Sequence, residues 1–186
     1  MNEDWLKEYF ELYKKPLFDK TIFSQLLKLK EDLEGVHQNG GKTMIMGNGG
    51  SAAMASHFSV DLTKNASLRC VNFNEADLIT CLANDYGFER WVEKAVDFYG
   101  DEGDLLIVIS SSGSSKNMLN GVRAARNGKF EAVVTLSGFD NNNPLCQLGD
   151  INLWVNSRAY NFVENIHQVW LLSLVDLIIG DKEYSA

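Results

Sequence analysis

Beyond residue 40, short apolar runs alternate with segments whose apolar residues recur at helical spacing. The apolar runs predict strands at residues 42–46, 69–73, 104–109, 130–136 and 151–155. The segments with helical spacing predict helices at residues 51–63, 75–82, 88–99, 115–127 and 160–179. Strands that are apolar nearly throughout are buried on both faces. The pattern therefore predicts a parallel sheet covered by helices on both sides, which is an α/β fold with three layers.

The start of the chain has a different pattern. Residues 2–36 carry apolar positions at helical spacing, interrupted by Pro16, and predict two helices. The first of them is rich in aromatic residues, namely Trp5, Tyr9, Phe10 and Tyr13. One small domain cannot cover all of these, so we expect a contact between subunits. We find no internal repeat or linker and predict one domain over 1–186, with 1–36 serving oligomerisation and 42–180 forming the α/β core.

Composition narrows the classes of function. The chain has 186 residues, of which 45% are hydrophobic and 23% charged, as in ordinary globular proteins. No apolar run reaches the roughly 18 residues of a membrane span, and the charged N-terminus lacks a signal-peptide core, so we expect a cytoplasmic protein without a membrane partner. A formal net charge of −8 disfavours direct binding to nucleic acid. The cysteines, with no CxxC spacing, are expected to be small core residues; they are Cys70, Cys81 and Cys146.

Two loops rich in small residues follow predicted strands. The glycine loop, GNGGSA at residues 47–52, follows the first strand, and the serine loop, SSSGSS at residues 110–115, follows DLLIVI. Each leads into a helix N-terminus, which offers unpaired N–H groups and a partial positive charge at the carboxyl edge of the sheet. Glycine lets the backbone approach a ligand closely, and the hydroxyls of Ser110, Ser112 and Ser115 add hydrogen-bond donors. The loops are thus suited to an anion such as a sugar phosphate.

A simpler explanation exists for each loop. Glycines serve tight turns and serines cap helices, so a single loop of this kind would favour no ligand. Two such loops, each after a buried strand, favour ligand binding. Neither has the GxGxxG spacing, and the glycine loop lacks the lysine of a nucleotide-binding loop, so no nucleotide cofactor is expected.

The order of several motifs resembles a known family. The chain contains GNGGSA followed by SAAMASHFSVDL, then LANDYGFE at 82–89 and ISSSGSSKN at 109–117. In this order the motifs resemble the sugar isomerase (SIS) domain family, specifically its phosphoheptose isomerase branch, over nearly the whole chain. The resemblance implies a five-stranded parallel sheet between helices and a homotetramer with sites at subunit interfaces. It also implies isomerisation of sedoheptulose 7-phosphate to D-glycero-D-manno-heptose 7-phosphate, a step toward surface polysaccharide.

The same resemblance assigns roles to individual residues. Contacts with the sugar are implied for Asn48, Gly49, Gly50, Ser51, Asn84, Asp85 and Glu164. The phosphate is implied to bind Ser110, Ser111, Ser112 and Ser115.

Aldose–ketose isomerisation also needs a base, together with an acid or a metal. His57 and Asp61 lie four residues apart and share one helix face, and Glu164 and His167 lie three apart on the last helix. Family members resembled here have His and Glu at the first two positions and Gln at 164. They have a further His where this chain has Leu172, and that His and the Glu form their acid/base pair.

We expect His57, Asp61 and Glu164 to carry catalysis, and a zinc site of these three residues with an open fourth position is chemically consistent. His167 is rotated well off the face of Leu172, which disfavours it as a substitute for the missing His. Each residue also has a simpler role. His57 can bond Asp61, His167 can be a partly buried interface residue, and Glu164 can favour the helix dipole.

Three hypotheses remain open on sequence alone. The first is the heptose phosphate isomerase, which His57, the ANDYG motif and both loops favour. The second is a non-catalytic SIS-domain protein that binds a sugar phosphate or a protein partner, similar to replication-initiation regulators, which Asp61 and Leu172 favour. The third is an isomerase of another sugar phosphate with Glu164 as the base, a role that requires burial or a negative neighbour to tune its protonation.

Overall fold

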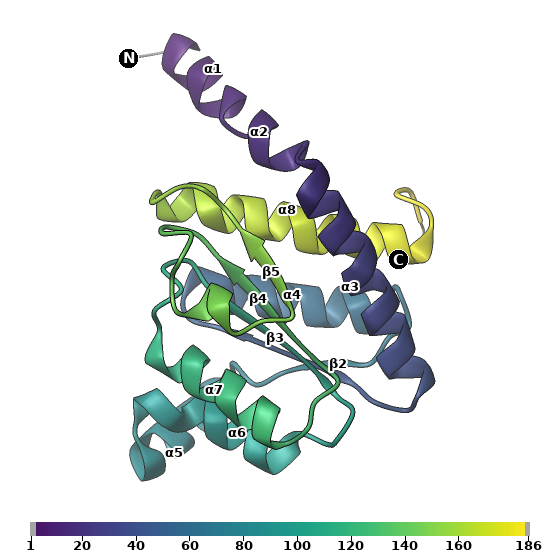
Figure 1. Ribbon diagram of the computed structural model, residues 1–186, viewed down its shortest axis with the longest axis vertical. Helices are drawn as coiled ribbons and strands as arrows, with labels where there is room; N and C mark the ends of the chain where they lie inside the picture. Colours follow the sequence, from purple (N-terminus) through teal and green to yellow (C-terminus); the bar gives the residue numbers. More distant parts are fainter. Residues whose placement is uncertain (1–2, 185–186) are drawn as a thin grey trace.

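The computed structural model describes residues 3–184 and contains a five-stranded sheet with the strand order β2-β1-β3-β4-β5 (Figure 1). The strands are β1 (Thr43–Gly47), β2 (Cys70–Asn72), β3 (Leu105–Ser110), β4 (Ala132–Ser137) and β5 (Ile151–Trp154). Every neighbouring pair is parallel. The predicted α/β fold with a parallel sheet is confirmed.

Helices cover both faces of the sheet (Figure 1). One layer consists of α3 (Lys20–Gln38), α4 (Gly50–Lys64) and α8 (Tyr160–Ile179). The other consists of α5 (Ala76–Tyr86), α6 (Trp91–Tyr99) and α7 (Lys116–Asn127), with the short 3-10 helices η1 (Phe88–Arg90) and η2 (Leu145–Gln147) beside it. Successive strand residues point to opposite faces, so Ile45 joins the first core and Met44 the second. This is why the strands are apolar throughout.

The N-terminal segment forms three helical pieces instead of the two predicted. They are α1 (Glu3–Glu11), α2 (Lys14–Leu17) and the long α3. Pro16 lies inside the short α2, and the Asp19 carboxylate then starts α3 by accepting a hydrogen bond from the Thr21 N–H at 2.8 Å. No residue of α1 is buried, and α1 and α2 project from the body of the molecule (Figure 1). Trp5 and Phe10 are therefore exposed, as expected for aromatic residues that the domain cannot cover.

The helix predicted at residues 75–82 continues to Tyr86, because Gly87, at φ +87°, is the residue that ends it. The extension places Asn84 and Asp85 in the last helical turn, where both are exposed. Cys81 on the same helix is also exposed, so the expectation of a core role is wrong for it, whereas Cys70 is buried.

Helix α8 is long and apolar enough by composition to span a membrane. In this fold it packs against the sheet and α4. Its buried residues are Phe162, Val163, Ile166, His167, Trp170, Leu171, Leu174 and Val175. Its apolar character is therefore accounted for by the protein core.

Candidate functional site

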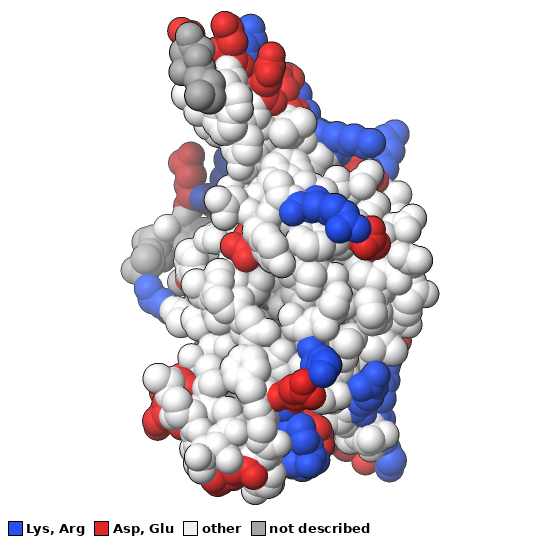
Figure 2. Space-filling view, turned by 90° about the vertical axis from the view of Figure 1, so that its left-hand side faces the viewer, with Lys and Arg blue, Asp and Glu red and all other residues white. Residues whose placement is uncertain are grey.

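The glycine loop and the serine loop lie next to each other at the carboxyl edge of the sheet. They follow the neighbouring strands β1 and β3, in which Gly47 is level with Ile109. Figure 2 looks onto the side of the molecule where α7 and α8 begin in Figure 1, and the middle of this view is mostly free of charged side chains. A ligand at this edge would be held by backbone groups and neutral side chains, as the sequence predicts.

The backbone of the glycine loop requires small residues. Gly49 has φ +57°, a left-handed conformation that favours glycine, and a Cβ on Gly47 would lie 2.6 Å from the backbone of Ser51. Helix α4 begins at Gly50 without a side-chain cap, and within residues 3–184 the N–H groups of Gly49 and Gly50 make no hydrogen bond. These N–H groups are free donors at the positive end of a helix dipole.

Two asparagines join the loops directly. The Asn48 side-chain amide donates to Asn117 Oδ1 at 3.1 Å, and the Asn117 amide donates back to Asn48 Oδ1 at 2.9 Å. Asn117 lies in the first turn of α7, immediately after the serine loop, and is buried. In the sequence, Asn117 is the last residue of the ISSSGSSKN motif, and no local signal predicts this role for it.

The serine loop contains hydroxyls with different surroundings. The Ser110 hydroxyl donates to Ser115 Oγ at 3.0 Å, and Ser112 Oγ accepts from the Ser114 N–H at 3.3 Å. The Ser111 hydroxyl is buried and has no partner among the described residues. A buried polar group without a partner is uncommon and fits a site whose ligand supplies the missing oxygen or proton.

Glu164, in α8, reaches the glycine loop. A Cβ on Gly50 would lie 2.4 Å from Glu164 Oε2, so the carboxylate occupies the space that a side chain at Gly50 would fill. The position at the start of α4 favours a negative charge. Tertiary structure thus brings Glu164 to the loops, as expected of a residue of the site.

The His57–Asp61 pair lies farther along α4. His57 Nε2 is 3.2 Å from Asp61 Oδ2, so the expected shared face is observed, and the His57 side chain is 50% exposed. At about 1.5 Å per residue, His57 and Asp61 lie roughly 10 and 16 Å along the helix from Gly50 and hence from the Glu164 carboxylate. Among residues 3–184 no three His, Cys, Asp or Glu side chains come close enough to hold a metal ion. The predicted zinc site of His57, Asp61 and Glu164 is therefore not assembled within one chain.

Leu172 lies in α8, eight residues after Glu164, and is half-buried. Helix α8 packs against α4, the helix that carries His57 and Asp61. A leucine offers no proton carrier in this part of the fold.

His167 is a core residue. Its Nε2 lies 3.1 Å from the carbonyl oxygen of Ser137, to which it donates in the neutral tautomer, and Nδ1 has no partner among the described residues. Burial lowers the pKa of His167 to about 4. The expected shared face of Glu164 and His167 does not produce a shared site. His167 is also neither a partly exposed interface residue nor a substitute for the missing His at Leu172.

Asn84 and Asp85 lie in the last turn of α5, and both are exposed. The Asn84 amide donates to Asp85 Oδ1 at 2.9 Å, and Asp85 Oδ2 lies 3.9 Å from Cys81 Sγ. None of their hydrogen bonds in the described chain reaches the glycine or serine loop.

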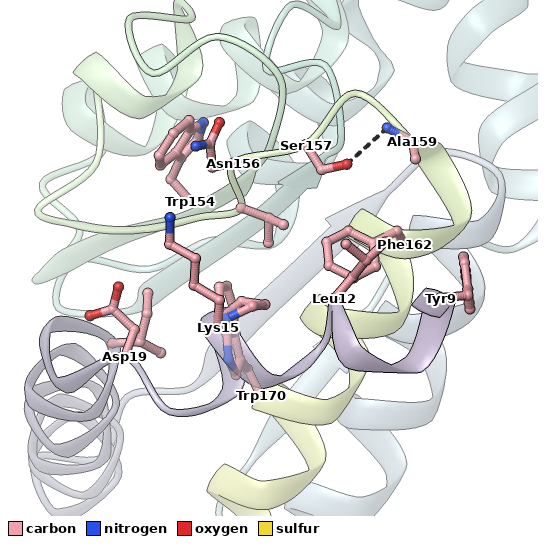
Figure 3. Close-up of a pocket in the computed structure, with 13 residues that line it drawn as sticks. Tyr9, Leu12, Lys15, Asp19, Trp154, Asn156, Ser157, Ala159, Phe162 and Trp170 are labelled. Atoms are coloured by element: carbon pink, nitrogen blue, oxygen red, sulfur yellow. Dashed lines mark hydrogen bonds between the residues drawn. The ribbon is translucent and has the colours of Figure 1, made fainter. Parts of the chain in front are cut away.

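A cavity of about 500 Å³ lies elsewhere, between the N-terminal helices and the β5–α8 region (Figure 3). Its lining is mainly aromatic and apolar and includes Tyr9, Leu12, Trp154, Phe162 and Trp170. The Lys15 side chain points across it toward Trp154 (Figure 3). No lining residue belongs to either loop, so this cavity is separate from the candidate site.

Comparison with known proteins gives one consistent result. A family model described as SIS domain matches residues 17–138. A phosphoheptose isomerase of Fusobacterium nucleatum is 33% identical over 177 residues, covering 91% of this chain and 89% of the relative, and one of Helicobacter pylori is 31% identical over 187 residues, covering 96% of each. The solved structure of a phosphoheptose isomerase from Francisella tularensis superposes with a TM-score of 0.86 at 28% identity, covering 97% of this chain and 100% of that one.

Proposed function

The chain belongs to the SIS domain family, and we propose that it isomerises sedoheptulose 7-phosphate to D-glycero-D-manno-heptose 7-phosphate in the cytoplasm. The relatives that match over nearly its full length carry the name phosphoheptose isomerase, so the non-catalytic alternative is not favoured. The observation that carries the proposal is the junction of the two loops through the Asn48–Asn117 pair, together with the unpartnered buried hydroxyl of Ser111 in the serine loop.

The two loops divide the substrate between them. The phosphate binds the serine loop, where Ser110, Ser111, Ser112 and Ser115 supply hydroxyls and the start of α7 supplies a positive helix dipole. The carbonyl end of the sugar lies at the glycine loop, in contact with Asn48, Gly49, Gly50 and Ser51. This arrangement suits a protein with a net charge of −8, because the donors are neutral groups.

Glu164 is placed to move the proton. Isomerisation transfers a proton between adjacent carbons through an enediol, and a carboxylate at the glycine loop lies at the carbonyl end of the bound sugar. The free N–H groups of Gly49 and Gly50 stabilise the developing oxyanion. The expected zinc ligands do not fit a metal within one chain, because among the described residues no three of the required side chains converge.

The site is completed across a subunit interface. His57 and Asp61 lie roughly 10 and 16 Å along α4 from the glycine loop. Asn84 and Asp85 face solvent on the opposite layer. We propose a homotetramer in which a second subunit brings such residues to the loops of the first. Support comes from the exposed aromatic residues of α1 and from the aromatic cavity beside the N-terminal helices (Figure 3). We take the whole chain as one SIS domain.

The test is turnover of sedoheptulose 7-phosphate by the purified protein, with and without added zinc, followed by NMR of the sugar carbons alongside calorimetric binding. Turnover is expected, and Glu164→Gln is expected to abolish it. Retained turnover in this variant would contradict Glu164 as the base. Binding without turnover would support the non-catalytic alternative, and the absence of binding would contradict the substrate class. A monomer in light scattering would contradict the proposed assembly.

A further inference from the structure

We propose that Asn117 is a positioning residue that acts through Asn48 and holds the glycine loop at a fixed separation from the serine loop. The hydrogen bonds within the glycine loop run from the Ser51 and Ala52 N–H groups to the Asn48 and Gly49 carbonyls and do not reach the serine loop. Three of its first four residues are glycines, and Gly49 adopts a left-handed conformation. Glycine loses more conformational freedom on folding than any other residue, so a loop of this composition depends on its neighbours for a single shape.

The geometry of the amide pair meets this need. Each amide both donates and accepts, at 3.1 and 2.9 Å, so both side chains are fixed in orientation as well as in position. Asn117 is only 3% exposed and lies in a helix that is packed against the sheet. The buried partner is therefore the rigid one, and Asn48 is the one that is held.

A second asparagine holds Gly47, the residue that precedes Asn48. The Asn74 amide donates to the Gly47 carbonyl at 2.7 Å, and Asn74 Oδ1 accepts from the Gly47 N–H at 3.4 Å. Asn72 in turn donates to Asn74 Oδ1 at 3.0 Å. Gly47 is thus tied to the β2 side of the sheet, whereas Asn48 is tied to α7. Asn117 lies in the first turn of α7, directly after the serine loop. Its bond to Asn48 therefore links the two loops that we propose to bind opposite ends of the substrate.

The catalytic consequence rests on the proposed function. A substrate anchored by its phosphate presents its carbonyl carbon at a distance set by the chain, and the donors at the glycine loop must meet it there. Misplacement of such donors by about 1 Å can cost a hundredfold in rate. Asn117 is not expected to touch the substrate. Its loss should lower kcat more than it raises KM, because the phosphate is bound by other residues.

The experiment measures loop exchange and turnover in the full-length protein. Backbone hydrogen exchange of a peptide spanning residues 47–52 is compared in wild type, Asn117→Ser, Asn48→Ala and the double variant. The matched control is Asn120→Ser, on the same helix, whose amide donates to the Glu89 carbonyl at 2.9 Å and not to a residue of either loop. Steady-state kcat and KM with sedoheptulose 7-phosphate are measured on the same samples.

We expect exchange of the loop to rise about tenfold or more in each single variant, since each removes both hydrogen bonds of the amide pair, with no further rise in the double variant. The control should match wild type, and kcat of Asn117→Ser should fall about tenfold or more with a smaller change in KM. Unchanged exchange in Asn117→Ser, additive effects in the double variant, or an unchanged kcat would overturn the proposal. If Asn117→Ser does not fold, Asn48→Ala removes the same two hydrogen bonds by changing the less buried partner. If the wild type turns over no heptose phosphate, the proposed function fails, and the exchange data still decide whether Asn117 holds the loop.

Discussion

Replacing Gly50 by alanine should move the Glu164 carboxylate while leaving the stability of the protein almost unchanged. The variant therefore tests whether turnover depends on the position of this carboxylate. The new Cβ would lie 2.4 Å from Oε2 and 2.9 Å from Cδ of Glu164. Carbon and oxygen atoms in ordinary contact are about 3.5 Å apart, so the carboxylate must move by about 1 Å. The obstacle is the end of a flexible side chain, which can change rotamer at a cost of about 0.5–1.5 kcal/mol.

The effect on stability is expected to be small. Gly50 is the first residue of α4 and has no positive φ, so alanine fits its backbone and improves helix propensity by up to about 1 kcal/mol. This gain offsets the cost of moving Glu164, and the free energy of unfolding should stay within about 1 kcal/mol of wild type. Turnover should nevertheless fall by about a hundredfold, because a proton carrier displaced by about 1 Å no longer meets its carbon in the productive geometry.

The assay pairs thermal unfolding with turnover of sedoheptulose 7-phosphate. Gly35→Ala is the matched control, since Gly35 also lies in a helix, and a Cβ there meets no atom within 4 Å. This variant should gain stability and keep wild-type turnover. Wild-type kcat in Gly50→Ala would refute the idea that the Glu164 carboxylate acts where the structure places it. A loss of more than about 2 kcal/mol of stability would show that Glu164 is not free to move aside, contrary to the rotamer cost used here.

Three further predictions follow from the same geometry. Leu172→His should raise turnover by about a hundredfold by supplying a proton carrier at a position where the resemblance to the SIS family implies a histidine, and an unchanged kcat would show that this position takes no part. Gly113→Ala should weaken binding of inorganic phosphate and destabilise the fold by about 1–3 kcal/mol, because Gly113 has φ +65° and the new Cβ would overlap the Asn143 side chain. Unchanged phosphate binding in calorimetry would contradict the serine loop as the phosphate site. Burial lowers the pKa of His167 from 6.5 to about 4. Between these pH values the unfolded chain binds a proton at His167 that the folded chain does not bind. The free energy of unfolding should therefore rise with pH across this window by up to about 3 kcal/mol. Urea unfolding across this window should show a flatter pH dependence for His167→Gln, and an equal slope in both proteins would refute the assignment.

Much of the fold could be predicted because buried parallel strands have a strong local signal. The strand predicted at 104–109 is observed at Leu105–Ser110, and the last helix has the predicted bounds, Tyr160–Ile179. Both elements are apolar at nearly every position that packs against the core. Errors occur where the pattern is weaker. The N-terminal segment breaks at a point that the helical spacing does not show, and α5 runs on to Tyr86 through polar residues.

The candidate site was predicted less completely. Helical spacing places Glu164 and His167 only about 60° apart around α8, which suggested a common site. The helix is packed so closely that this small rotation separates two environments, one at the glycine loop and one in the core against β4. The proposed zinc ligands fail for a related reason, since a shared helix face says nothing about distance along the helix.

The sequence by itself determined the alternation of strands and helices, the two loops at strand ends, and the resemblance to the SIS family. These features are local, because each depends on residues within one element or one turn. Only the tertiary structure decided which distant residues meet, such as Asn48 with Asn117 and Gly50 with Glu164. Those contacts depend on the order β2-β1-β3-β4-β5 and on the way α8 lies along α4. The strand order and the arrangement of α8 along α4 both result from the packing of whole elements, which no local pattern of residues predicts.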